Sequence, residues 1–239
     1  MNFKKVDEYL RKKKKEHVTF DRLMKQKKSI PFAKVNIKLG FGRRNYKNSR
    51  KKEIYMNTEN LKLRLLEEYD LDEICKMVFE SFAKGTDYSD GVAEEKLVRE
   101  IVSMPYYIPE LAFVAEIDGE AVGFCMLSKF PLSGKHEEEF LILSPVAVDY
   151  RYLRRGIGKR MLTLAIERAK AMGFKGILVE GNPAFYHTVG FSISTDFDIH
   201  PGESVNLPAP ECLMAMELYG GALDNISGYV DYSMYKSLT

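Results

Sequence analysis

Apolar positions from Leu61 onward repeat with two periods, about two residues in some segments and three to four in others. The short period, or an unbroken apolar run, predicts strands at 61–66, 111–117, 120–128, 139–148, 175–180, 191–195 and 211–218. The helical period predicts helices at 71–83, 91–103, 157–172 and 183–188. Asp118-Gly119 is a strong signal for a two-residue hairpin turn. This order predicts a mixed α+β domain built around one sheet.

The first part of the chain has a different pattern. A loose helical stripe in residues 2–28 is interrupted by the Lys12–Lys15 run, and residues 29–49 contain Pro31 and few periodic apolar positions. Residues 1–52 carry 19 Lys and Arg against 4 Asp and Glu, whereas the rest carries 17 against 30. We therefore expect a basic N-terminal extension, 1–58, joined to an acidic domain, 59–239.

The extension has two interpretations. Its charge favours attraction to nucleic acid, to a ribosome or to an anionic membrane surface. Alternatively it is a solvated arm that contacts the acidic domain, which we favour because runs of charge are usually solvated.

Composition narrows the class of protein. A chain of 239 residues with 45% apolar content can bury a sizeable core. Three cysteines without a C-x-x-C spacing argue against a disulfide framework and against a metal site. No apolar run has the length of a signal peptide or a membrane span. We expect a soluble protein of the reducing cytoplasm with no bound metal.

The segment LSPVAVDYRYLRRGIGKRML, residues 143–162, predicts a phosphate site. An apolar strand leads through a basic turn with two glycines into an amphipathic helix, and a helix start offers unpaired N–H groups and a positive dipole end to an anion. We expect the two glycines to allow unusual dihedrals and close approach of a ligand. The expected backbone donors are Arg154, Arg155, Gly156, Ile157, Gly158 and Lys159. Five cations, enough for a ligand with several phosphates, are expected beside them: Arg151, Arg154, Arg155, Lys159 and Arg160. The spacing fits neither a P-loop nor a dinucleotide fingerprint.

These residues resemble the signature [Q/R]-x-x-G-x-[G/A] of the GNAT superfamily of acetyl-CoA-dependent N-acetyltransferases. Residues 173–191, which end in Tyr-x-x-x-Gly-Phe, and residues 206–235 are also similar to this superfamily, the latter to its YhbS-like branch. The chain departs from the signature at its first position, which is Leu153. The resemblance implies a mostly antiparallel central sheet that splays in the middle and is flanked by helices.

The resemblance also implies roles for individual residues. Pro145 stands where the central strand would break, and the main chain of Val146, Ala147 and Val148 would contact the pantetheine arm of acetyl-CoA. Asn182 would also contact the cofactor. Tyr186 would return a proton to the departing thiolate.

The general base is open among three glutamates. Glu180 ends a predicted buried strand, and Glu138 or Glu139 begins the central strand. His187 is expected to be a surface residue, because neighbouring residues on a helix point apart. Cys125 and Cys212 lie in apolar alternation, and we expect them to be buried thiols and not nucleophiles.

The expected function is acetyl transfer from acetyl-CoA to a primary amine by direct attack in a ternary complex. The alternatives are a non-catalytic acyl-CoA-binding module, tethered to RNA, a ribosome or an acidic partner through the basic arm, and an interaction protein that has lost ligand binding. Other expected partners are a peptide or small-molecule amine, a weakly bound anionic partner for the arm, and a second copy of the chain in a homodimer.

Overall fold

A mixed seven-stranded sheet organises the domain. The computed structural model describes residues 60–238, and the sheet has the strand order β1-β2-β3-β4-β5-β8-β6. All neighbouring strands are antiparallel except β4 and β5. The strands are β1 (Lys62–Leu65), β2 (Ala112–Ile117), β3 (Glu120–Lys129), β4 (Phe140–Val148), β5 (Gly176–Glu180), β6 (Ser192–Ile193) and β8 (Leu213–Glu217). This confirms the expected α+β fold with a mostly antiparallel sheet.

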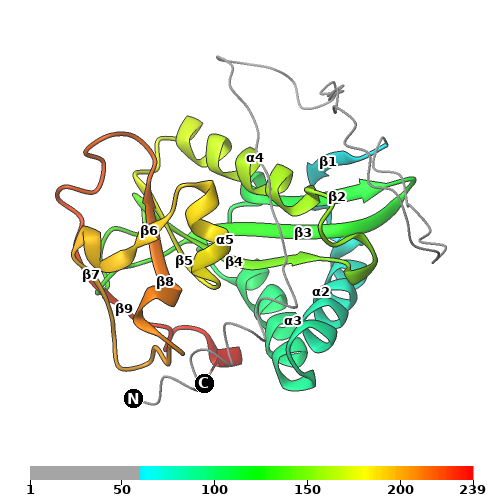
Figure 1. The fold of residues 1–239 in the computed structure, drawn as a ribbon, viewed down its shortest axis with the longest axis horizontal. Coiled ribbons are helices and arrows are strands. Elements are labelled where there is room, and N and C mark those ends of the chain that lie inside the picture. The colour runs from blue at the N-terminus through cyan, green and yellow to red at the C-terminus, as the bar shows by residue number, and fades with distance from the viewer. Residues whose placement is uncertain (1–59, 239) are drawn as a thin grey trace, which may run out of the picture.

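Helices cover both faces of this sheet (Figure 1). On one face lies α4, and on the other lie α2 and α3, which pack against each other. The helices are α2 (Leu71–Gly85), α3 (Tyr88–Ser103), α4 (Ile157–Ala171) and α5 (Pro183–Tyr186). Short 3-10 helices are found at Glu68–Asp70, Pro109–Leu111, Tyr150–Tyr152, His187–Val189, Ser194–Phe197, Pro210–Cys212 and Lys236–Leu238.

The sheet separates two hydrophobic cores. Val146 and Val148 contribute to the core under α4, while Ala147, between them, contributes to the core under α2 and α3. This alternation follows from the two-residue period of a strand and explains why β4 reads as an almost continuous apolar run. The strand is buried on both faces, so its position is fixed from both sides.

Most element boundaries agree with the sequence prediction, and the differences have local causes. The Asp118-Gly119 turn takes positive φ values of 52° and 87°, as the hairpin requires. Helix α3 begins three residues earlier than expected, because the Asp87 side chain caps it by accepting a hydrogen bond from the Asp90 N–H at 3.1 Å. Met172, the last residue of the helix predicted at 157–172, lies just beyond α4, which ends at Ala171, and is 41% exposed.

The C-terminal part contains a pairing that the sequence did not predict. Strands β7 (Ile199–Pro201) and β9 (Gly228–Val230) form a separate two-stranded parallel sheet. The three-residue strands are too short to show periodicity, and the pairing joins segments almost thirty residues apart in the chain. The tail then crosses to α3, where the Glu100 carboxylate accepts hydrogen bonds from the N–H groups of Lys236 (2.7 Å) and Ser237 (2.9 Å).

An ion pair fastens the edge of the sheet to the start of α2. The Arg64 guanidinium donates to both carboxylate oxygens of Asp70, at 2.5 and 2.8 Å, and to Glu116 at 3.0 Å. The hydrogen bond from Arg64 is the main cause that lowers the pKa of the Asp70 carboxyl, and burial acts in the opposite direction. Asp70 is 4% exposed, so its carboxylate is shielded from water, whereas the Arg64 side chain is 28% exposed.

The predicted basic extension, residues 1–58, lies outside the described residues, so its boundary and its role stay predictions. Among the residues described, no helix has the length and apolar character needed to cross a membrane.

Candidate functional site

The two central strands separate halfway along β4. Strand β5 pairs with β4 only from Phe140 to Ile142, whereas β3 stays paired with β4 as far as Val148. A bulge marks the separation, because Met126 of β3 lies opposite two residues of β4, Ser144 and Pro145. The strand break expected at Pro145 is therefore present, and it opens one edge of β4.

Backbone groups along the open edge can be assigned from the pairing with β3. The Asp149 N–H donates to the Val122 carbonyl at 3.0 Å, so the backbone groups of Asp149 and Ala147 face β3. Those of Val146 and Val148 therefore point to the open edge. The Ser81 hydroxyl of α2 donates to the Val148 carbonyl at 3.2 Å. Of the three backbone positions expected to contact the ligand, only Ala147 directs its backbone groups toward β3 and not toward the open edge.

A charged cluster braces the turn that follows β4. Asp149 accepts a hydrogen bond from the Arg151 N–H at 2.8 Å and others from its guanidinium at 2.6 to 3.1 Å. Arg151 also pairs with Glu120, whose carboxylate accepts a hydrogen bond from the Tyr152 hydroxyl at 3.3 Å. Arg151, one of the five cations expected beside the ligand, therefore holds the loop instead.

The start of α4 matches the predicted anion site. Arg154 and Gly156 have positive φ values of 62° and 75°, and Gly156 is the N-terminal cap of α4, with no side-chain oxygen bonded to the helix end. A Cβ built on Gly156 would meet no atom of the described chain within 4 Å, so the space over it is open. Gly158 instead lies in the first turn of the helix and has no positive φ, so the prediction of unusual dihedrals is wrong for this glycine.

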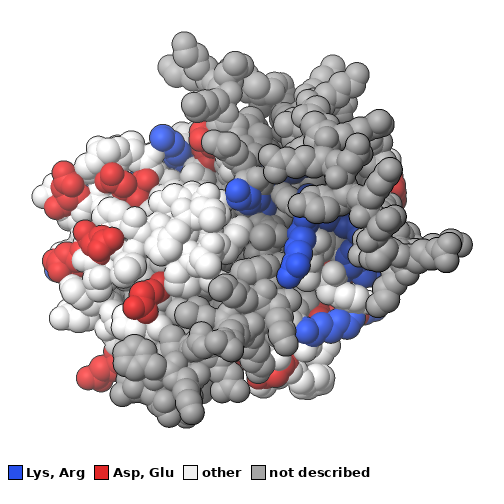
Figure 2. All heavy atoms as spheres, in the orientation of Figure 1, with Lys and Arg blue, Asp and Glu red and all other residues white. Residues whose placement is uncertain are grey.

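Positive charge surrounds this helix end. In Figure 2, Lys and Arg gather on the half of the visible face where α4 begins, whereas Asp and Glu predominate near β6 and β7. Arg154 is exposed, and the Arg155 guanidinium lies 5.6 Å from the centre of the Tyr152 ring. Lys159 follows on the first turn of the helix. Backbone donors, helix dipole and cationic side chains therefore coincide at one place.

Asn182 is the second feature that fits a ligand. Its side-chain oxygen caps α5 by accepting a hydrogen bond from the Ala184 N–H at 2.9 Å. Asn182 is 8% exposed, and its Nδ2 atom is buried without a hydrogen-bond partner among the described residues. A buried amide donor without a partner is costly, and a ligand carbonyl would satisfy it.

A cavity of about 370 Å³ opens beside the separated strands. Its floor is the break in β4, one wall comes from α2 and α3, the opposite wall from β5 and α5, and the C-terminal segment closes one end. The residues that line it are Ser81, Phe82, Gly85, Thr86, Glu94, Leu97, Ile142, Leu143, Ser144, Pro145, Val146, Glu180, Gly181, Asn182, Phe185, Tyr186, Ser204, Asn206, Tyr232, Tyr235 and Leu238.

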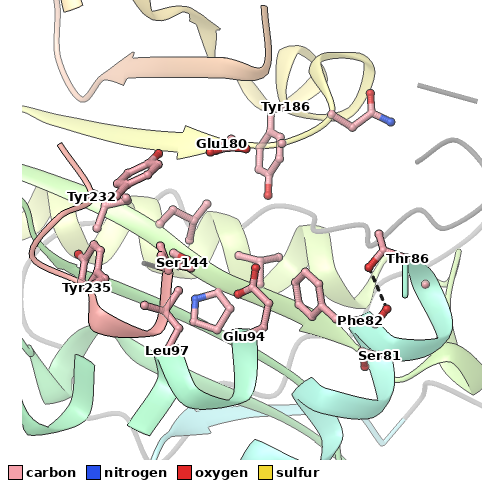
Figure 3. Close-up of a pocket in the computed structure, with 18 of the residues that line it drawn as sticks. Ser81, Phe82, Thr86, Glu94, Leu97, Ser144, Glu180, Tyr186, Tyr232 and Tyr235 are labelled. Carbon is pink, nitrogen blue, oxygen red and sulfur yellow. Dashed lines mark hydrogen bonds between the residues drawn. The ribbon is translucent and has the colours of Figure 1, made fainter. Parts of the chain in front are cut away.

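Tyr186 directs its hydroxyl into this cavity (Figure 3). The ring is held by edge contacts with Phe185 and Phe191, at centroid distances of 5.0 and 5.5 Å. Gly181 lies directly beside it, since a Cβ there would come within 2.5 Å of the Tyr186 ring. The side chain is 8% exposed, so the hydroxyl is presented from a fixed ring.

Glu180 lies at the end of β5 in the same cavity and next to Tyr186 (Figure 3). Burial and then the nearby Glu180 carboxylate raise the pKa of the Tyr232 hydroxyl well above its ordinary value. Tyr232 therefore stays protonated and can donate toward Glu180. The cavity thus holds the Tyr186 hydroxyl and the Glu180 carboxylate together, the two kinds of group that acid and base chemistry requires.

The other candidates for the base are engaged elsewhere. Glu138 pairs with Lys129, and Glu139 pairs with Lys175 and with His136. The hydrogen bond with Lys175, and to a smaller extent the one with His136, lowers the pKa of the Glu139 carboxyl. Neither glutamate lines the cavity.

His187 and the cysteines match their sequence-based expectations. His187 is exposed and its Nδ1 contacts the Phe191 carbonyl at 2.8 Å. The thiols of Cys125 and Cys212 are fully buried, and burial raises the pKa of Cys125. A thiol held in its neutral form is a poor nucleophile.

Sequence reasoning missed Glu94 and the C-terminal tyrosines. Glu94 rises from α3 toward the cavity from the side opposite Tyr186, and Tyr232 and Tyr235 form the wall beside it (Figure 3). Glu94 stands in a run of charged residues that reads as a solvent face, and the tyrosines stand outside any regular element. Only the packing of the tail against α3 makes them neighbours.

The chain was compared with known proteins. The family model described as "Acetyltransferase (GNAT) family" matches residues 76–191. An "Uncharacterized N-acetyltransferase YjhQ" of Escherichia coli K12 is 28% identical over 123 residues, which cover 51% of this chain and 62% of that protein. The match thus spans less than two thirds of this relative's length.

Solved structures share the fold. YhbS from E. coli, in complex with CoA, superposes with a TM-score of 0.63 at 20% identity, covering 74% of this chain and 91% of that one. A GNAT family acetyltransferase from Brucella melitensis, in complex with acetyl-CoA, gives a TM-score of 0.58 at 19% identity, covering 73% and 97%. The separated strands therefore lie in a domain whose residues 76–191 match the GNAT acetyltransferase family model and whose fold is that of these solved structures.

Proposed function

We propose that this protein transfers an acetyl group from acetyl-CoA to a primary amine by direct attack in a ternary complex. The observation that carries the proposal is the separation of β4 from β5, which exposes backbone groups of β4 beneath the Tyr186 hydroxyl and the Glu180 carboxylate. The match to the family model and the acetyl-CoA and CoA complexes of the similar structures support the choice of cofactor.

The cofactor would lie along the opened edge. The N–H groups at the start of α4, from Gly156 to Lys159, would bind the diphosphate, with Arg154 and Arg155 beside them. Backbone groups of Val146 and Val148 and the buried Asn182 Nδ2 would bind the pantetheine amides. Open space over Gly156 and an amide donor without a partner are the two features that fit such a ligand.

The side chains in the cavity supply the proton transfers. Bound acetyl-CoA provides a reactive thioester with a good leaving group. Glu180 accepts a proton from the incoming ammonium, directly or through water, so that the nitrogen lone pair can attack. Tyr186 donates its proton to the departing sulfur. A covalent route through cysteine is not part of the proposal, because Cys125 and Cys212 are buried outside the cavity.

The same arrangement favours an enzyme over a binding module. A module needs the phosphate site alone, whereas this chain also places a hydroxyl and a carboxylate in one cavity at the strand break. The cysteine thiols agree with the cytoplasm as the proposed compartment. A homodimer and an anionic partner of the basic arm also stay proposals.

A thiol-release screen tests the proposal. Purified full-length protein would be mixed with acetyl-CoA and with polyamines, aminoglycosides, amino acids or peptide N-termini, while a thermal-shift titration measures CoA binding. We expect bound CoA to raise the melting temperature of the protein. With at least one of the amines, we expect acetyl-CoA to be converted to free CoA and an N-acetyl amide. Binding of CoA without transfer to any amine would instead support the non-catalytic module.

A further inference from the structure

The charge of the cavity restricts the acceptor further. Both ionisable acidic groups that line it, Glu94 and Glu180, are carboxylates on opposite walls, and no Lys, Arg or His of the described residues lines it. Figure 3 shows Glu94 entering from α3, with Glu180 across the cavity beside Tyr186. Two carboxylates in one cavity favour a ligand with positive charge and disfavour one that carries a carboxylate.

Aromatic rings lie around these carboxylates. Phe82, Tyr232 and Tyr235 line the cavity together with Glu94, and the last two are 9% and 2% exposed. Faces of aromatic rings attract ammonium groups, and the attraction grows when water is excluded. Burial first, and then the nearby Glu180 with a smaller effect of Glu94, raise the pKa of Tyr232. Both carboxylates line the same cavity as this tyrosine.

We propose that the acceptor is a dication without a carboxylate, such as an aliphatic diamine, with its reacting amine at Glu180 and its second ammonium at Glu94. The inference rests on the proposed function and adds to it the charge class of the substrate. Glu94 is a binding residue in this scheme, since it lies across the cavity from Tyr186. The buried Asn182 donor, on the cofactor side, gives an independent indication that the cavity is built for a ligand.

Three amines with four carbons each test the inference on the unmodified full-length protein. 1,4-Diaminobutane carries a second positive charge besides that of its reacting amine. n-Butylamine has no second charged group, and 4-aminobutyrate has a negatively charged carboxylate in its place. We expect kcat/KM with acetyl-CoA to be at least about tenfold higher for the diamine than for n-butylamine, and lowest for 4-aminobutyrate. Equal values for all three, or a preference for 4-aminobutyrate, would overturn the inference while leaving acetyl transfer established.

A pair of variants then assigns the second ammonium. Glu94→Gln should lower kcat/KM for the diamine, so that its preference over n-butylamine falls to within about threefold. Glu95→Gln is the matched control, because it removes one negative charge from the same helix outside the cavity. A preference that survives Glu94→Gln would exclude Glu94 as the binding residue.

Calorimetry with the CoA-loaded protein separates this inference from the proposed function. Binding of the diamine that is tighter than that of n-butylamine and depends on Glu94, without any acetyl transfer, would support the dication site and refute the enzyme. Absence of both binding and transfer would overturn both.

Discussion

The proposed phosphate-binding end of the cleft is built from one short stretch of chain, residues 149–159, whereas the proposed acceptor cavity is assembled from segments between 81 and 238. The first end would bind its ligand mainly through backbone N–H groups and a helix dipole, which depend on local conformation. The second would bind through side chains that meet only when α3, β5 and the C-terminal tail pack together. Changes at the two ends should therefore have separable effects on cofactor and acceptor.

The largest effect is expected where the two ends meet, at Tyr186. Tyr186→Phe keeps the ring contacts with Phe185 and Phe191 but removes the hydroxyl. We expect kcat to fall by about 100-fold, the lower range for loss of a general acid, with the CoA dissociation constant unchanged. Steady-state kinetics and CoA titration measure the two quantities. The control is Tyr229→Phe, at a position 60% exposed outside the cavity. An unchanged kcat would remove Tyr186 from the mechanism.

A change at Gly156 should affect the cofactor end alone. Gly156→Val places a β-branched side chain at φ 75° and in the open space over the loop. We expect the CoA dissociation constant to rise by about tenfold or more, because the side chain displaces the diphosphate and strains the loop.

Gly173→Val supplies a control for strain on the same helix. Gly173 follows the other end of α4 with φ 89°, also in open space. Both variants should lower the melting temperature, but only Gly156→Val should weaken CoA binding. Equal loss of CoA affinity in the two would show that helix strain, and not the loop, is responsible.

Loosening the tail should affect the acceptor end alone. Glu100→Gln replaces the carboxylate that holds the N–H groups of Lys236 and Ser237, next to the tyrosine wall of the cavity. Hydrogen bonds to a charged group contribute about 1.5 to 3 kcal/mol, so we expect the acceptor KM to rise by about threefold to tenfold. The acetyl-CoA KM should stay constant. Glu110→Gln, which is exposed and outside the cavity, should change neither constant.

The smallest effect on activity is expected at the Arg64–Asp70 pair, which belongs to neither end. Asp70→Asn should leave both KM values unchanged but lower the free energy of unfolding at pH 7 by about 2 kcal/mol, because the Asp70 carboxylate is buried and the pair is bidentate. Glu80→Gln, which breaks the exposed pair with Lys84, should change the free energy of unfolding far less. Denaturant unfolding measures both.

The pH dependence of stability gives this pair a signature. Since the pKa of Asp70 is lower in the folded protein than its ordinary value of 3.8, the stabilisation is complete above about pH 5 and is lost as the pH falls through the folded-state pKa. Asp70→Asn should therefore flatten the loss of stability below pH 4. An unchanged acid profile would mean that other carboxylates dominate it.

Much of the cofactor end could be derived from the sequence, because its determinants are local. The turn after β4, the start of α4 and the position of Tyr186 follow from spacing, glycine and periodicity. The hairpin at Asp118-Gly119 follows from backbone preference in the same way. Even so, sequence reasoning assigned Arg151 to the ligand, since the partners Asp149 and Glu120 could be matched to it only in three dimensions.

The sequence by itself determined the order of elements, the strand break at Pro145 and the basic, glycine-capped start of α4, because each depends on residues within a few positions of one another. Only the tertiary structure decided that Glu94 faces Glu180, that Asn182 keeps a buried donor and that two tail tyrosines close the cavity. These contacts join segments separated by up to about 140 residues of chain. No local pattern encodes such contacts, since they arise from the packing of whole elements against the sheet.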